Sequence, residues 1–178
     1  MEIRRVVTIK NSSGKSVVAS DGPSPAARAL KHTPGFVSTP LWFTGSPAQK
    51  ATDASDPAAR FETLAPGPGG TSFMIVTFPP DAVMMAPNFD PAAAGAEFLE
   101  ATPGIAHAME MDNPGMHTTA TVDYAIVLAG EVWLELDDGA TVHLKQHDVV
   151  VQNGARHAWR NKGDQPVTMA FVLIGAAR

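Results

Sequence analysis

Residues 117–161 decide the fold of this chain, and they read HTTATVDYAIVLAGEVWLELDDGATVHLKQHDVVVQNGARHAWRN. Short runs rich in Val, Ile, Leu, Thr and Trp alternate in this stretch with turn signals. Asp138-Gly139 stands between LEL and TVHL, a pattern typical of a tight β-hairpin, and Asn153-Gly154 is a second turn signal. Short strands at even spacing favour a sandwich or barrel over alternating strands and helices. The stretch therefore predicts an all-β fold.

The strand pattern continues on both sides of this stretch. Residues 3–9 and 15–19 flank a turn cluster and predict an N-terminal hairpin. Pro40 lies within the predicted strand Phe36–Phe43 and favours an edge position, because proline has no N–H to donate. Further strands are predicted at 72–78, 106–111, 117–129, 131–137, 140–145, 148–152, 156–161 and 166–174.

One structural domain is expected, because 178 residues are enough for a single core and few for two. Residues 1–104 are predicted to form an extension that packs on a barrel core of residues 105–178. The extension includes one short helix, which begins after Asp90-Pro91. It also includes a Pro- and Gly-rich excursion at 45–70, predicted to be either a lid over the barrel mouth or an arm toward a partner subunit.

Charge and composition exclude several classes of function. The formal net charge is -5 with a pI near 5.6, so no basic surface favours nucleic acid or an anionic membrane as partner. The chain has no cysteine, which rules out disulfides, thiolate nucleophiles and Cys-ligated metals. No secretory signal and no apolar run of membrane-spanning length are present, so a soluble, cytoplasmic protein is expected.

Two groups of residues at alternate positions predict a polar site inside the barrel. Side chains two apart on a strand share a face. The first group is His117, Thr119, Thr121 and Asp123, and the second is His157, Trp159 and Asn161. Facing strands of a small barrel would bring His117, Asp123 and His157 together. Two imidazoles and a carboxylate are ligands that a divalent transition metal accepts.

The same residues resemble two motifs of the cupin superfamily, small jelly-roll β-barrels. One family motif pairs two histidines and a glutamate ahead of a glycine; here His117, Thr119 and Asp123 stand in those places before Gly130. The second motif is matched by Gly154, His157 and Asn161. Thr119 replaces a histidine, Asp123 replaces the glutamate, and Gln152 stands where proline is usual. The resemblance implies a cupin-type jelly-roll β-barrel, a homodimer and a small-molecule substrate.

The resemblance implies an enzyme that uses a divalent metal (Fe, Mn, Zn or Ni) on an apolar organic substrate. Lyase or decarboxylase, isomerase and dioxygenase chemistry all remain open. His117, Asp123 and His157 would be the metal ligands, and Asp123 and His157 the catalytic groups. Asp123 is shorter than glutamate and could instead orient a histidine. The alternative is a metal-free protein that binds or senses a small molecule, with Thr119 marking a lost metal site.

Several neighbours of these residues are candidates for a substrate pocket. Arg160, if it points inward, could bind a substrate carboxylate through two hydrogen bonds. Apolar and hydroxyl side chains would line the rest of the pocket: Met116, Thr119, Thr121 and Trp159. Tyr124 has the opposite parity to Asp123, which predicts a position between sheets or at a dimer surface.

Overall fold

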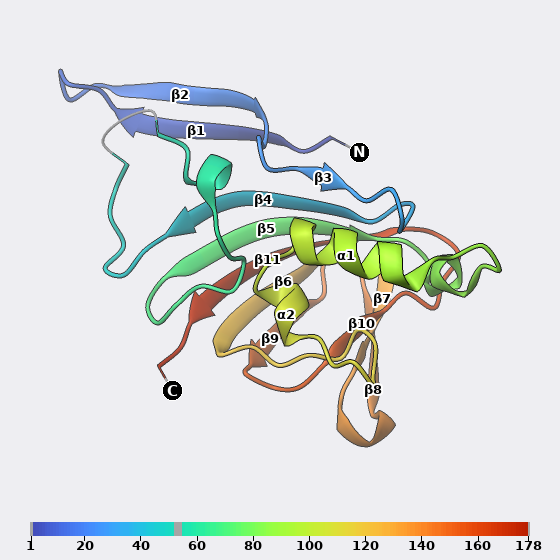
Figure 1. The fold of residues 1–178 in the computed structure, drawn as a ribbon. Helices are drawn as coiled ribbons and strands as arrows, with labels where there is room; N and C mark the ends of the chain where they lie inside the picture. Colours follow the sequence, from blue (N-terminus) through green and yellow to red (C-terminus); the bar gives the residue numbers. More distant parts are fainter. Residues whose placement is uncertain (1, 52–54, 178) are drawn as a thin grey trace.

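A computed structural model of the chain describes residues 2–51 and 55–177 (Figure 1). An N-terminal hairpin pairs β1 (Arg4–Lys10) with β2 (Ser16–Pro23), as predicted. Within the described ranges, the main sheet has six strands in the order β3-β4-β5-β11-β6-β9, and a second sheet has three in the order β10-β7-β8. The structure confirms the all-β prediction.

Strands that are far apart in sequence build the main sheet. Its members are β3 (Arg28–Ala29), β4 (Val37–Thr44), β5 (Thr71–Phe78), β6 (Thr121–Ala129), β9 (Val149–Asn153) and β11 (Val167–Gly175). The second sheet consists of β7 (Glu131–Glu135), β8 (Thr141–Lys145) and β10 (Ala158–Arg160). Because β5 pairs with β11 over eight residues, a single sheet joins the first hundred residues to the last fifty.

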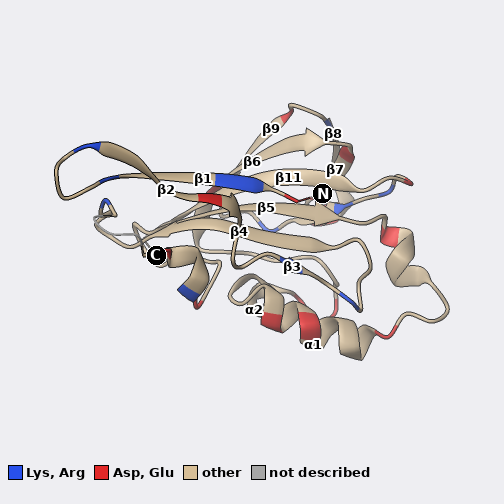
Figure 2. Ribbon diagram, turned by 90° about the horizontal axis from the view of Figure 1, so that it is seen from above, with Lys and Arg blue, Asp and Glu red and all other residues tan. Residues whose placement is uncertain are grey.

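The predicted helix is α1 (Pro91–Ala101), and it begins as the sequence indicated. The Asp90 carboxylate accepts the backbone N–H groups of Ala92 and Ala93 at 3.0 and 3.1 Å, and Pro91 fills the first helical position. The part of the chain that the structure describes also contains three short 3-10 turns: η1 (Pro57–Arg60), η2 (Asp81–Met85) and η3 (Asp137–Gly139). Figure 2 shows acidic residues on α1; one of them, Glu97, accepts the N–H groups of Lys31 and His32.

Residues 106–111 do not form the predicted strand. They begin within α2 (Ile105–Ala108), which follows Gly104 in a left-handed conformation (φ 85°). Alanine is a strong helix former and a weak strand former, and Ala106 and Ala108 both lie in this turn. The His107 Nδ1 atom accepts the Gly104 N–H at 3.3 Å and stabilises the turn. His107 is exposed on α2, so it is a helix-capping residue here.

The predicted strand 117–129 is broken, and only residues 121–129 belong to the main sheet. His117 instead forms isolated bridges with Met109 and with His157, and its N–H and C=O both bond His157 at 3.0 Å. His157 immediately precedes β10, so His117 is tied to the second sheet while Thr121 begins a strand of the main sheet. The chain therefore passes from one sheet to the other between these residues, as at the corners of sandwich folds.

The inward face of β6 has a polar end and an apolar end. Thr121 and Asp123 are buried at its start, and Ala125 and Val127 are buried farther along. Beyond them the two sheets pack around an apolar core whose fully buried members include Val132, Val167 and Met169. The candidate site thus lies at one end of a filled barrel.

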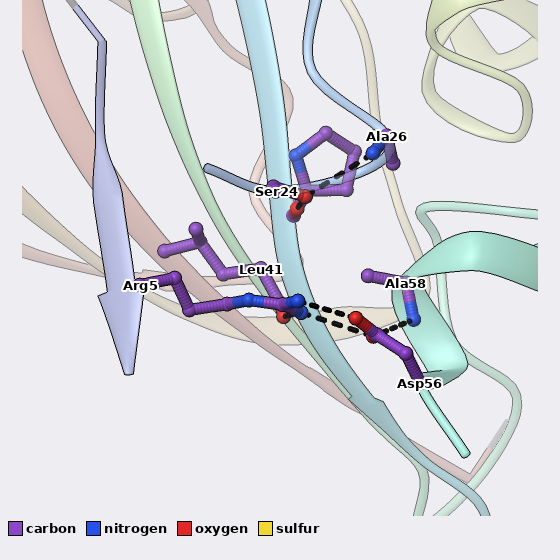
Figure 3. A network of polar contacts seen from close by, with 7 residues as sticks. Arg5, Ser24, Ala26, Leu41, Asp56 and Ala58 are labelled. Carbon is purple, nitrogen blue, oxygen red and sulfur yellow. Dashed lines mark hydrogen bonds and ion pairs between the residues drawn. The ribbon is translucent and has the colours of Figure 1, made fainter. Parts of the chain in front are cut away.

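The Pro- and Gly-rich excursion packs against its own chain. The Arg5 guanidinium, from β1, donates through Nη1 to the Leu41 carbonyl at 2.9 Å and through both Nη atoms to the Asp56 carboxylate (Figure 3). Asp56 also caps η1 by accepting the Ala58 N–H. Farther along, Leu64 is almost fully buried in the core. These contacts hold the hairpin, β4 and the excursion together. Residues 52–54 of the predicted excursion lie outside the described ranges.

Replacing Arg5 by leucine is expected to lower the unfolding free energy by about 2 kcal/mol, because the Asp56 carboxylate and the Leu41 carbonyl then lose a largely buried donor. Urea denaturation measures the change. Arg4→Leu is the matched control: Arg4 pairs with Asp21 on the same hairpin, but both side chains are exposed, at 73% and 44%. Little change is expected there. Equal losses in the two variants would contradict the role given to Arg5.

The outer face of the main sheet exposes apolar side chains on neighbouring strands. Val149 and Val151 on β9 are about 60% exposed, and Tyr124 on β6 is 44% exposed. Tyr124 therefore faces away from the buried Asp123, as its parity predicted. A homodimer through this face stays a prediction. Within residues 2–51 and 55–177, every helix falls short of the length or apolar character needed to cross a bilayer.

Candidate functional site

Two buried histidines lie against each other where the chain passes between the sheets. The ring centroids of His117 and His157 are 4.3 Å apart, with the ring planes inclined by 50°. Both side chains are buried, at 7% and 3% exposure. The paired backbone bonds between the two residues fix this arrangement, since each N–H donates to the other residue's carbonyl. The sequence prediction that these histidines meet is consistent with the structure.

The hydrogen bonds of the rings define which nitrogen carries the proton. His117 Nδ1 lies 3.1 Å from the Gly115 carbonyl, and His157 Nδ1 lies 2.8 Å from the Ala155 carbonyl. A carbonyl oxygen only accepts, so each Nδ1 donates, and Nε2 keeps the lone pair of the neutral ring. The backbone carbonyls thus leave an unprotonated Nε2 on each of the two neighbouring rings.

Burial keeps both imidazoles neutral. It lowers the pKa of His117 below its ordinary value, although the Gly115 carbonyl and the charge of Glu110 act in the opposite direction. The pKa of His157 falls to about 4, first because of burial and second because of its neighbour His117. A charged form of either ring is therefore costly, since desolvation disfavours the cation.

A row of hydrogen-bonded hydroxyls leads from the sheet corner to Asp123. The Oγ atoms of Thr119 and Thr121 are 2.7 Å apart, and Thr121 precedes Asp123 by two residues on the same buried face of β6. Burial raises the pKa of Asp123, and the Thr121 hydroxyl only partly offsets this. All three side chains are at most 9% exposed. Thr119, which stands where the resembled motif has a histidine, here serves as the outer member of this row.

Gln152 is a member of the site that sequence reasoning treated only as a departure from a motif. It lies directly opposite Asp123 in the pairing of β9 with β6, so both side chains project from the same face. Asp123 Oδ1 and Gln152 Nε2 are buried and have no hydrogen-bond partner within the described chain. The signal in the sequence was the polar residue at the fourth position of the apolar run VVVQ.

The predicted three-ligand metal site is not assembled in this structure. No three His, Cys, Asp or Glu side chains in the described ranges are grouped so that they could hold an ion together. His117 and His157 supply two imidazoles, whereas Asp123 belongs to the other sheet and lies beyond the break in the strand. Catalytic zinc sites have three protein ligands, so the residues present do not fit that arrangement. Use of a divalent metal stays a prediction.

The other predicted pocket residues divide into two groups. Met116 is almost fully buried beside His117, and the Trp159 ring packs edge-on against His157 at a centroid distance of 5.6 Å. Arg160 points elsewhere: its Nε atom donates to Glu135 and its Nη1 atom to the Pro114 carbonyl. Arg160 is therefore engaged in an ion pair, and the structure gives it no part in binding a substrate carboxylate.

Two further features lie away from this site. His143 stacks on Trp133 with the ring planes 2° apart and bonds the Glu131 carboxylate on the exposed face of the second sheet. A hollow of about 210 Å³ lies between α1 and the segment around β3, with Leu30 and Phe61 among its lining residues. Neither feature contacts the histidine pair.

Comparison with known proteins gives partial relatives from fungal biosynthesis clusters. No family model matches the chain. Phomopsin biosynthesis cluster protein D of Diaporthe leptostromiformis is 51% identical over 62 residues, which are 34% of this chain and 33% of that protein. Oryzines biosynthesis cluster protein J of Aspergillus oryzae is 36% identical over 87 residues, 49% of this chain and 45% of that protein.

A further relative is named as a cupin-domain-containing protein. The cupin-domain-containing oxidoreductase virC of Hypocrea virens is 40% identical over 62 residues, 33% of this chain and 32% of that protein. The match therefore spans between a third and a half of the length of these curated relatives.

Solved structures with cupin domains are similar at low identity. The cupin domain of Schizosaccharomyces pombe Cnp3 has a TM-score of 0.47 at 9% identity, covering 98% of this chain and 89% of that one. A cupin 2 conserved barrel domain protein from Salinispora arenicola has a TM-score of 0.42 at 17% identity, covering 84% of this chain and 87% of that one. Over 62 residues the sequence is thus similar to that of a cupin-domain-containing oxidoreductase, and the two-sheet, all-β architecture agrees with the resemblance to the cupin superfamily.

Proposed function

We propose that this chain is a small-molecule enzyme that moves a proton on an organic substrate at the His117–His157 pair, without a metal-dependent step. The observation that carries the proposal is the pair itself: both Nδ1 atoms donate to backbone carbonyls, which leaves Nε2 unprotonated on two buried rings whose centroids are 4.3 Å apart. A general base must be unprotonated and fixed in orientation, and both conditions are met by these rings.

The proposed step is proton abstraction from a carbon next to a carbonyl group. One Nε2 takes the proton, the C–H bond breaks, and the electron pair moves onto the carbonyl oxygen. Because burial disfavours the imidazolium, the proton then leaves Nε2 for another carbon or for the oxygen, which completes an isomerisation. Trp159 packs against His157 and provides an apolar wall for the substrate.

The relatives favour an enzyme over a purely structural protein. Two of them are named as members of biosynthesis clusters and one as an oxidoreductase. Oxidoreductase chemistry would need a redox partner, and the three-ligand site predicted for a metal is not assembled here. Proton transfer needs only the residues present, so isomerase or lyase chemistry fits this chain better. The second candidate, a metal-free binding protein, is supported by the unpartnered Asp123 and Gln152 atoms.

Hydrogen–deuterium exchange of substrate protons tests the proposal before the natural substrate is known. The protein is incubated in deuterated water with a panel of small cyclic ketones, lactams and 1,3-dicarbonyl compounds, and loss of the α-proton signals is followed by proton NMR. The parent is expected to accelerate exchange for at least one compound. His157→Gln is expected to reduce that rate about a hundredfold, the lower end of what a positioned base contributes.

His143→Gln is the control, because His143 lies on the exposed face of the second sheet. Its exchange rate should equal that of the parent. Exchange that persists in the double variant His117→Gln/His157→Gln would refute the proposal. So would stoichiometric iron, manganese, zinc or nickel in protein purified without affinity-tag metal, if His157→Gln lost that metal and the activity together.

A further inference from the structure

Two buried polar atoms of opposite character are neighbours inside the barrel. Gln152 Nε2 is a donor and Asp123 Oδ1 is an acceptor, and each lacks a hydrogen-bond partner within the described residues. The two residues are direct cross-strand partners on β9 and β6, where opposite side chains stand about 5 Å apart at Cβ. They are 5% and 7% exposed. Buried side-chain atoms without partners are rare, so the pair requires an explanation.

The surrounding residues direct these two atoms toward a ligand. Thr121 precedes Asp123 on the same buried face of β6, and Asp123 Oδ1 has no hydrogen-bond partner within the described residues. Thr119 supports Thr121 from the far side. Asp123 Oδ1 is thus a buried acceptor that stays open to a ligand.

We propose that Gln152 and Asp123 form a subsite that binds an amide group presenting its C=O and N–H along the same edge, as in a lactam or a primary carboxamide. The substrate carbonyl would accept from Gln152 Nε2, and the substrate N–H would donate to Asp123 Oδ1. The inference rests on the proposed function, because it takes the barrel end beside His157 as the substrate site.

Other functional groups match this subsite less well. A ketone or ester has no N–H and leaves Asp123 Oδ1 without a partner. An ionised carboxylate would meet the Asp123 carboxylate, and the two guanidinium groups that follow Gln152 in the chain are already paired: Arg156 bonds Glu110 and Asp137, and Arg160 bonds Glu135. A site built to hydrogen-bond a polar group discriminates strongly against analogues that lack it.

Three ring compounds of similar shape test the subsite: 2-piperidone, N-methyl-2-piperidone and δ-valerolactone. Calorimetric titration of the parent should show 2-piperidone binding at least about tenfold more tightly than either analogue, as expected for one buried hydrogen bond. The preference should vanish in Gln152→Met and in Asp123→Leu, which remove the donor and the acceptor. It should persist in Val151→Thr, whose side chain is 60% exposed on the same strand.

Equal affinity of the parent for all three compounds would overturn the subsite, as would a preference that survives in Gln152→Met. A crystal structure of the parent soaked in 2-piperidone gives a readout without variants. A lactam bonded to both residues supports the subsite. A water molecule that stays between Gln152 and Asp123 and is not displaced by the lactam would refute the subsite, because the two atoms would then bind only a buried water.

The outcome is separable from that of the proposed function. His157→Gln should reduce α-proton exchange about a hundredfold and leave the preference for 2-piperidone intact, because His157 is not part of the donor–acceptor pair. If the parent protein does not accelerate α-proton exchange but still prefers 2-piperidone, the proposed proton-transfer function is refuted and the subsite is supported. If the parent accelerates exchange but does not prefer 2-piperidone, the subsite is refuted and the proton-transfer function is supported.

Discussion

Lowering the pH from 6.5 to 4 is expected to remove up to about 3 kcal/mol of unfolding free energy through His157 alone, since its pKa falls from 6.5 to about 4 on folding. In that interval the unfolded chain binds a proton at this imidazole and the folded chain does not. The unfolded state is therefore favoured as the pH falls, and the loss is complete near pH 4. His117, whose pKa is also lowered by burial, adds to the effect with the same sign.

The comparison that isolates His157 is urea denaturation of the parent, His157→Gln and His143→Gln at several pH values between 7 and 4.5. The pKa of the Asp56 carboxyl is lowered from an ordinary value of 3.8, which already lies below this pH range. Asp56 therefore contributes little to the pH dependence between pH 7 and 4.5. Asp123 acts with the opposite sign, since its raised pKa lets the folded state take a proton first. A background of Asp123→Asn removes that contribution. An unchanged pH slope in His157→Gln would contradict the assignment.

Replacing Gly175 by alanine is expected to cost about 3 kcal/mol of unfolding free energy, at the upper end for overpacked sites. A Cβ on Gly175 would lie 1.9 Å from the carbonyl oxygen of Gly67 and 2.5 Å from its carbon. Both are backbone atoms, so no side chain can move aside. The approach is close because Gly175 exchanges backbone hydrogen bonds with the excursion, donating to Gly70 and accepting from Gly69 at 2.9 and 2.8 Å.

Gly45→Ala is the matched control for this substitution. Gly45 lies in the same excursion, and a Cβ there meets nothing within 4 Å, so a change within about 0.5 kcal/mol is expected. Similar denaturation midpoints for Gly175→Ala and Gly45→Ala would show that the excursion does not pack against the end of β11. Gly175 pairs with Thr121 across β11 and β6, so a shift at this contact would also disturb the hydroxyl row that leads to Asp123.

Most strand positions in the barrel half could be predicted from the sequence because short apolar runs alternate there with turn signals. Asp138-Gly139 needed a turn with positive φ, and both residues have it, at 57° and 72°. Residues 106–111 were predicted wrongly because apolar residues at this spacing suit a strand and a short helix equally well. The N-terminal strands of the main sheet were also recognisable, but their place beside β11 depends on pairing over a long sequence distance.

Sequence alone determined the kinds of polar residue in the site, since parity placed His117, Thr119, Thr121 and Asp123 inside and Tyr124 outside. Tertiary structure decided how they group. The break before Thr121 assigns His117 to His157 and the second sheet, and it leaves Asp123 on the main sheet opposite Gln152. Alternate residues share a face only while a strand is continuous, and the sequence pattern did not reveal the break before Thr121. The partner across the sheet depends on the register between two strands, which the pattern along one strand does not determine.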